Sequence, residues 1–297
     1  AAGQGVRTVL QGHTADDQAE TFLMRLARGS GLYGLGAITP VSSAQGVTWR
    51  RPLLGLRRAA LREYLTARGM TWIEDPSNRD HSFTRVKIRE TMPALAPLGL
   101  TVERLAETAA QLRRAGDVVA HAVAELAAAA ARAEEAGYVT LDRAACAAAL
   151  PELRLRLLAE TLRWVSGADY TPRLAQLDAL AGWAFAGEAD GRRRTLHGCL
   201  LERTDRAVLI LRELERTGPP VPAGELWDGR WLTGPARPGL TVGALGHAAL
   251  ADLPGWRETG IPSDALAATP AFRDSAGGLI AAPFALPAKP CHSRLVG

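Results

Sequence analysis

The chain has 297 residues, a formal net charge of +4 and a hydrophobic content of 47%. This length predicts two domains or three small ones, and the composition excludes a disordered chain because it supplies enough apolar side chains for packed cores. The three cysteines lie far apart without a Cys-x-x-Cys pair, which argues against a zinc site and is typical of a reducing compartment. No apolar run is long enough to span a membrane, so we predict a cytoplasmic protein without a membrane partner.

The first 95 residues predict an α/β arrangement. The elements expected there are a strand at 6–10, a helix that begins after Thr14, a strand at 47–51, a helix at 57–68 that ends at Gly69, and a short helix that ends before Pro93. The segment Pro93–Gly99 contains two prolines and a glycine and is typical of a linker, so we place the first domain at 1–95.

The rest of the chain predicts a mainly helical domain at 96–216 and a small β-rich domain at 217–297. The second domain is expected to contain a long helix at 101–136, a strand at 138–141, helices at 151–165 and 173–186, and strands at 195–202 and 207–212. The third domain is rich in Gly and Pro, and its strand-like runs occupy 225–233 and 278–284.

Residues Gly12–Gly36, with the sequence GHTADDQAETFLMRLARGSGLYGLG, combine a dense group of titratable side chains with a predicted strand-to-helix turn. Thr14 followed by Asp17 fits a capping box, and His13 lies at the turn itself. The helix is predicted to have an apolar side formed by Ala15, Ala19, Phe22 and Leu26, and Asp17 and Glu20 are predicted to project together from the opposite face. Ligands bind at such turns in open α/β sheets, although a well-capped surface helix would show the same spacing.

This segment resembles the signature of the tRNA(Ile)-lysidine synthetases, members of the PP-loop ATP pyrophosphatase group. Three further blocks resemble this family in order and approximate spacing: Arg51-Pro52-Leu53-Leu54 with Arg58, Leu61 and Tyr64; Trp72-Ile73-Glu74-Asp75-Pro76-Ser77-Asn78; and Phe83-Thr84-Arg85-Val86-Lys87-Ile88-Arg89 ahead of Met92-Pro93-Ala94-Leu95. The resemblance covers residues 6–95 and implies a partial Rossmann-like PP-loop domain.

Two departures from the family pattern affect the expected activity. The family carries an SGGxDS loop near its N-terminus, where backbone N–H groups would hold ATP phosphates, and this chain has no such motif. Since the chain also begins with Ala1-Ala2-Gly3, we expect a fragment that lacks the upstream half of the nucleotide-binding domain and is inactive alone. Val86 stands where the family usually has asparagine, which puts a polar contact at that position in doubt.

The resemblance implies ATP-dependent ligation of L-lysine to C2 of the wobble cytidine in tRNA(Ile) with a CAU anticodon. ATP, with Mg²⁺, would adenylate the C2 oxygen and release pyrophosphate, and the lysine ε-amine would then displace AMP. An ammonium group is not a nucleophile, so the lysine must be held and deprotonated, and paired carboxylates suit that task.

The resemblance also implies roles for individual residues. Asp17 and Glu20 would bind or activate the lysine amine, with Mg²⁺ binding as the competing role, and His13 would orient substrate or contact the nucleotide. The residues expected to bind substrate or nucleotide are Asp16, Arg28, Arg85, Lys87 and Arg89. The two C-terminal domains would recognise the body and acceptor stem of the tRNA, and a homodimer is allowed.

Basic residues concentrate between Trp49 and Arg89, where ten arginines or lysines accompany four acids and aromatic residues are interspersed. A basic surface with aromatic side chains is typical of an RNA contact. We interpret four of these residues instead as the solvated side of a helix: Arg57, Arg58, Arg62 and Arg68. Arg192-Arg193-Arg194 fits either a contact to the tRNA backbone or a solvated turn.

Two alternative functions are compatible with the sequence. Another PP-loop enzyme, such as a tRNA thiolase, would share the ATP chemistry, but none of the three cysteines lies near residues 12–36. The second alternative is a tRNA-binding fragment without catalytic activity, because the absent phosphate loop would weaken ATP binding.

Overall fold

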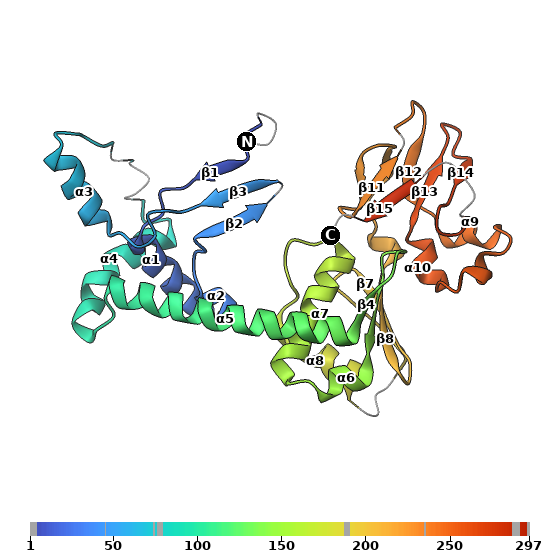
Figure 1. The fold of residues 1–297 in the computed structure, drawn as a ribbon, viewed down its shortest axis with the longest axis horizontal. Helices are drawn as coiled ribbons and strands as arrows, with labels where there is room; N and C mark the ends of the chain where they lie inside the picture. Colours follow the sequence, from blue (N-terminus) through green and yellow to red (C-terminus); the bar gives the residue numbers. More distant parts are fainter. Residues whose placement is uncertain are drawn as a thin grey trace. The chain divides into compact units, whose positions relative to one another are not determined.

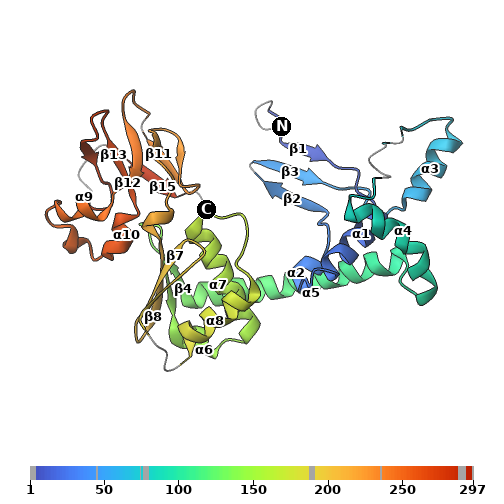
Figure 2. The ribbon, with the colours of Figure 1, turned by 180° about the vertical axis from the view of Figure 1, so that it is seen from behind.

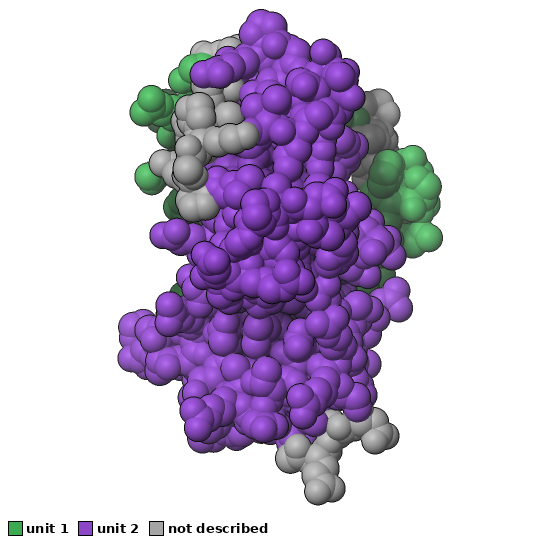
Figure 3. All heavy atoms as spheres, turned by 90° about the vertical axis from the view of Figure 1, so that its right-hand side faces the viewer, with its two compact units in different colours: residues 1–120 green, residues 121–297 purple. Residues whose placement is uncertain are grey.

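The computed structural model describes residues 5–44, 46–73, 75, 80–186, 191–234, 236–286 and 292–295, so the predicted loop Pro76–Asn78 lies outside the described residues. The chain divides into two compact units, 1–120 and 121–297, which are coloured separately in Figure 3. An α/β region, a helical region and strand-rich C-terminal sheets follow one another along the chain and confirm the predicted fold class. The domain boundaries at 95 and 216 stay predictions.

Unit 1 contains a three-stranded sheet in the order β1-β3-β2. β1 (Thr8–Leu10) runs parallel to β3 (Val47–Arg50), and β2 (Val41–Ala44) is antiparallel to β3. The predicted strands at 6–10 and 47–51 are therefore confirmed, whereas the sequence pattern did not predict β2.

Helix α1 (Ala15–Leu26) follows β1 directly and packs against α4 (Thr84–Leu95). Its apolar face enters the core of unit 1, because Ala15, Ala19 and Phe22 are buried together with side chains of α5 (Val102–Ala130). Short helices follow at α2 (Leu32–Leu35) and η3 (Ala96–Leu98). Three of the four residues predicted to form the apolar face of α1 are thus buried, whereas the fourth, Leu26 in the last turn, is 51% exposed.

Helix α3 (Arg58–Ala67) has ten residues, and none of them is buried. Figures 1 and 2 both show α3 standing apart from α1, α4 and α5. Its N-terminal end is fixed to α1, since the Ala15 N–H donates to the Leu56 carbonyl oxygen at 2.9 Å.

Two predicted helix ends are wrong. Helix α4 continues through Pro93 to Leu95, because a proline in the last turn removes only one backbone hydrogen bond. The predicted helix 101–136 ends at Ala130, and the alanine-rich chain continues as β4 (Ala131–Ala133), which pairs with β5 (Val139–Asp142). The hydrogen bonds of this pairing outweigh the helix propensity of alanine.

Unit 2 begins with a five-stranded antiparallel sheet in the order β4-β5-β8-β7-β6. The helices of this region are α6 (Arg143–Ala148), α7 (Pro151–Ser166) and α8 (Leu174–Phe185), and the remaining strands are β6 (Arg193–Leu196), β7 (Cys199–Arg203) and β8 (Ala207–Arg212). The predicted strand 195–202 is in fact the β6–β7 hairpin, which turns at His197-Gly198 with positive φ at both residues.

Two smaller sheets complete unit 2. One has the order β14-β13-β12-β9, from β9 (Val221–Pro222), β12 (Thr241–Ala244), β13 (Pro270–Arg273) and β14 (Leu279–Ala281). The other consists of β10 (Leu226–Trp227), β11 (Trp231–Gly234) and β15 (His292–Leu295). The short helices here are η4 (Leu214–Arg216), α9 (His247–Ala251), η5 (Trp256–Thr259) and α10 (Ser263–Ala267).

The predicted strand 225–233 is also a hairpin, formed by β10 and β11 around Asp228-Gly229, where both residues have positive φ. Among the described residues, no helix combines the length and the apolar character that crossing a bilayer requires.

Candidate functional site

The N-terminus of α1 is capped by the pair that the sequence predicted. Asp17 Oδ2 accepts hydrogen bonds from the backbone N–H of Thr14 at 2.8 Å and from its hydroxyl at 2.7 Å. Because one Asp17 oxygen is used in this way, only Oδ1 is directed toward other groups, and the Arg58 guanidinium lies 3.3 Å from it.

Asp16 connects α1 to the start of α3. Its Oδ2 accepts the Arg58 backbone N–H at 2.7 Å, and its Oδ1 lies 3.3 Å from the Arg57 guanidinium, which is also paired with Glu103. Burial by itself raises the pKa of Asp16, but the hydrogen bonds from Arg58 and Arg57 outweigh it, so the pKa lies below its ordinary value of 3.8.

This lowered pKa predicts a pH dependence of stability. The folded pKa of Asp16 is below the unfolded one, so the ionised group stabilises the fold above about pH 4, and this contribution is lost as the pH falls through the folded pKa. We expect Asp16→Asn to lose less thermal stability than the wild type between about pH 5 and pH 3. Melting temperatures measured across this range test this, and parallel curves for the two proteins would contradict it.

Glu20 is surrounded by arginines, and its side chain is only 2% exposed. Arg89 Nε donates to Glu20 Oε1 at 2.8 Å, while Arg85 Nε and Arg58 Nη2 lie at 3.6 and 3.7 Å from its oxygens. The hydrogen bond to Glu20 raises the pKa of Arg89 above its ordinary value, in spite of partial burial. Glu20 therefore lies on the face of α1 opposite its apolar side, as predicted, but it is enclosed there, because α4 covers that face and supplies Arg85 and Arg89.

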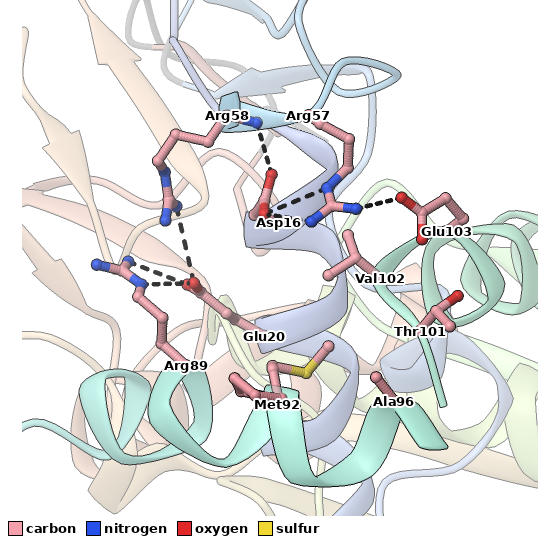
Figure 4. A pocket seen from close by; sticks show the side chains of 11 residues that line it. Asp16, Glu20, Arg57, Arg58, Arg89, Met92, Ala96, Thr101, Val102 and Glu103 are labelled. Carbon is pink, nitrogen blue, oxygen red and sulfur yellow. Dashed lines mark hydrogen bonds and ion pairs between the residues drawn. The ribbon is translucent and has the colours of Figure 1, made fainter. Parts of the chain in front are cut away.

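A cavity of about 430 Å³ opens beside these ion pairs, as Figure 4 shows. It is lined by three carboxylates and three guanidinium groups, from Asp16, Glu20, Glu103, Arg57, Arg58 and Arg89. Its other wall is formed by Met92, Pro93, Ala96, Thr101 and Val102. The volume lies within the range of small-molecule sites, and the lining combines balanced charge with an apolar wall.

A second cavity of about 480 Å³ lies on the α4 side and is lined by Met24, Arg89 and residues 82–86. Arg89 borders both cavities, and Arg85 borders the second. Val86 is 5% exposed, so the valine that replaces the family's asparagine occupies a buried position where an apolar side chain is well suited.

The structure brings Asp16, Glu20 and Arg89 together in the first cavity and places the other predicted site residues around it. Asp17 and Arg85 adjoin the cluster through Arg58 and Glu20. His13 is half-buried at the turn between β1 and α1, and its Nδ1 has no partner among the described residues.

Arg28 and Lys87 are not brought to the first cavity. Arg28 is exposed beyond the C-terminal end of α1, whereas the cavity is lined from the N-terminal half of that helix. Lys87 is exposed on α4 between Arg85 and Arg89.

Sequence reasoning missed three residues of the cavity: Arg57, Arg58 and Glu103. The interpretation of Arg57 and Arg58 as solvated is wrong, because both are held by carboxylates of α1. One signal could have found them. Arginines at the first turn of a helix oppose the helix dipole, so their presence indicates carboxylates nearby.

Within the described part of the chain, no group of three histidine, cysteine or acidic side chains is placed to hold a metal ion. Asp16, Asp17 and Glu20 are each paired with an arginine. This arrangement does not fit Mg²⁺ coordination by these carboxylates.

Comparison with known proteins agrees with this architecture. Residues 1–95 match the family model of the PP-loop domain. The chain is 42% identical to the tRNA(Ile)-lysidine synthase of Ruegeria pomeroyi over 283 residues, which cover 94% of this chain and 66% of that protein. It is 42% identical to the protein of the same name from Methylobacterium nodulans (74% of this chain, 65% of the relative) and 38% identical to that from a Bradyrhizobium species (69% and 62%).

The N-terminal region is thus a PP-loop domain, with its charged cavity beside the first helix. Across 94% of its length the similarity continues beyond that domain, and the chain belongs to the tRNA(Ile)-lysidine synthase family. The chain spans just under two thirds of the length of these three relatives.

Proposed function

We propose that the protein acts in the ATP-dependent ligation of L-lysine to C2 of the wobble cytidine of tRNA(Ile) with a CAU anticodon. The observation that carries this proposal is the first cavity, with three carboxylates, three guanidinium groups and an apolar wall. A free amino acid carries both an ammonium and a carboxylate, and lysine joins them to an aliphatic chain. This lining therefore matches lysine in charge and in polarity.

The ammonium of lysine has a plausible place between Asp17 and Glu20. Arg58 contacts both carboxylates, but at 3.3 and 3.7 Å these contacts are longer than a good hydrogen bond. The incoming ammonium can therefore displace the Arg58 guanidinium and give a proton to one carboxylate, and the neutral amine that results attacks C2. The Arg57 guanidinium, which lines the same cavity, would pair with the carboxylate of the lysine.

The remaining roles concern the nucleotide and the RNA. Arg85 and Arg89 would stabilise the phosphate of the adenylated cytidine, and His13 would orient substrate at the β1–α1 turn. ATP would be the second substrate, and Mg²⁺ would accompany its phosphates. The names of the relatives support tRNA as the partner.

The buried cysteines do not favour the thiolase alternative. Burial raises the pKa of the Cys146 thiol to about 11 and that of Cys199 to about 12. Both groups are therefore protonated and poorly nucleophilic near neutral pH.

The proposal is tested by tRNA-dependent incorporation of labelled lysine, assayed with this chain and with a form that carries an SGGxDS loop upstream. Incorporation that requires the tRNA with a CAU anticodon supports the ligase. Binding of tRNA without incorporation by either form would favour a binding module.

In the form that carries the SGGxDS loop, we expect Asp17→Ala to reduce lysine incorporation by about tenfold to hundredfold, because it removes a charged partner of the amine. The matched control is Asp117→Ala, which removes an exposed carboxylate from α5. Asp17 also caps α1, so thermal unfolding of both variants must be compared. Normal incorporation by a folded Asp17→Ala variant would refute the carboxylate role.

A further inference from the structure

Outside the two cavities, α3 and the segment after it expose aromatic side chains beside arginines. Tyr64 is 55% exposed and Trp72 is 41% exposed. The Arg68 guanidinium lies 4.4 Å from the centre of the Tyr64 ring, and that of Arg62 lies 5.5 Å from the Trp72 ring. We call these four residues the stacking surface, because each pair presents a flat ring together with a cation.

The charge of this region favours a polyanionic partner. Residues 57–73 contain four arginines and one acid, Glu63. The cores of protein–protein interfaces are depleted of charged residues, whereas proteins that bind single-stranded RNA combine arginine with exposed aromatic rings. A cavity of about 460 Å³ lined by Thr66, Trp72 and residues 69–71 adjoins the surface and adds room for a planar group.

The stacking surface continues from the first cavity. Arg58 lines that cavity and is the first residue of α3, and its backbone N–H is held by Asp16. The helical rise of about 1.5 Å per residue places Tyr64 about 9 Å farther along the axis. A nucleic acid with one base in the cavity would therefore place the neighbouring nucleotides over α3.

We propose that the stacking surface binds the unpaired nucleotides next to the base that enters the first cavity. Their bases stack on Tyr64 and Trp72, and their phosphates pair with Arg62 and Arg68. The inference rests on the proposed function in one respect, namely that the substrate is RNA. It further explains why α3 buries none of its own residues, since its partner is the substrate.

The test uses an RNA hairpin whose unpaired loop carries 2-aminopurine beside the target cytidine, because stacking on an aromatic ring quenches this fluorophore. A fully paired duplex of equal length serves as the reference RNA at the same salt concentration. We expect tighter binding and stronger quenching with the loop. Alanine substitution of a stacking residue weakens binding by about 5- to 150-fold, so we expect such losses for Tyr64→Ala and Trp72→Ala with the loop alone.

Three control variants make the result specific. Tyr64→Phe keeps the ring and should bind as the wild type does. Tyr170→Ala removes a tyrosine of unit 2 that is 71% exposed, and should leave the quenching unchanged. Arg68→Ala should weaken binding of loop and duplex alike. It should also reduce the slope of log affinity against log salt concentration by about one.

Equal binding of loop and duplex, or normal quenching with Tyr64→Ala and Trp72→Ala, would overturn the inference. A change of sedimentation coefficient in these variants, with RNA binding intact, would instead identify the surface as a contact between proteins. Normal lysine incorporation with unchanged quenching in Tyr64→Ala would overturn only this inference. Loop binding through Tyr64 without any lysine incorporation would overturn only the ligase.

Discussion

Replacing Asp228 with asparagine is expected to destabilise the protein by about 3–5 kcal/mol, because it leaves two buried arginines without their counter-charge. The Asp228 side chain is 2% exposed, and it lies 2.7 Å from Arg212 and 3.4 Å from Arg230, which are 9% and 4% exposed. Burial lowers the pKa of Arg230, and the nearby carboxylate only partly offsets this effect.

The Asp228→Asn substitution removes the negative charge but keeps nearly the same side-chain shape. Asp228 lies in the β10–β11 turn at a φ of 51°, a conformation that asparagine also tolerates, and its Oδ1 could still accept the Gly218 N–H. Urea unfolding measures the effect. The matched control is Glu160→Gln, which removes a carboxylate 2.6 Å from Arg163 where both side chains are about half exposed, and should cost less than about 1 kcal/mol. If both variants lost the same free energy of unfolding, burial of the ion pair would not be the cause of the large effect at Asp228.

If the proposed ligation takes place, Arg89→Ala in the form that carries the SGGxDS loop is expected to lower the rate of lysine incorporation by about 100- to 1,000-fold, the usual effect of removing a group that stabilises charge in a transition state. Arg89 is the only described residue that borders both the first and the second cavity, and it also donates to Glu20 at short distance. Arg89→Lys keeps the charge but loses the planar fork, so its activity should lie between those of alanine and wild type.

A structural effect of Arg89→Ala must be separated from a catalytic one, because the change leaves the buried Glu20 with weaker partners. The double variant Glu20→Gln with Arg89→Ala should recover stability without recovering activity. Arg114→Ala, which removes an exposed arginine of α5, is the control for loss of positive charge. A folded Arg89→Ala variant with activity near that of the wild type would refute the role.

The two largest expected effects concern the ion pair of Glu20 with Arg89 and that of Asp228 with Arg212, and the sequence pointed to these two pairs to different extents. The resemblance implied site roles for Glu20, Arg85 and Arg89, which lie in the motifs at 12–36 and 83–89, but it did not indicate that Arg58 joins them. The partnership of Asp228 with Arg212 was not indicated at all, because it joins a hairpin turn to a strand sixteen residues earlier and no local pattern marks it.

Periodicity separated the two faces of α1 but did not show how far each face is buried. Ala15, Ala19 and Phe22 enter the core as predicted, whereas Leu26, on the same predicted face, is 51% exposed. Glu20 is buried as well, because the helical wheel reports which side chains share a face but not which other helix covers that face. Arginines of helix α4 cover this face of α1, so the charged side chain of Glu20 is buried.

By itself, the sequence determined the family, the α/β start of the chain, the cap of α1 and three of the six charged residues that line the first cavity. These features depend on neighbours a few residues apart, where spacing and propensity decide the outcome. Only the tertiary structure decided that Arg57 and Arg58 line the first cavity, that Glu20 is enclosed, and that the helix at 102–130 gives way to a strand. Each of these depends on contacts between segments distant in sequence, whose energies exceed the local preferences that a sequence pattern records.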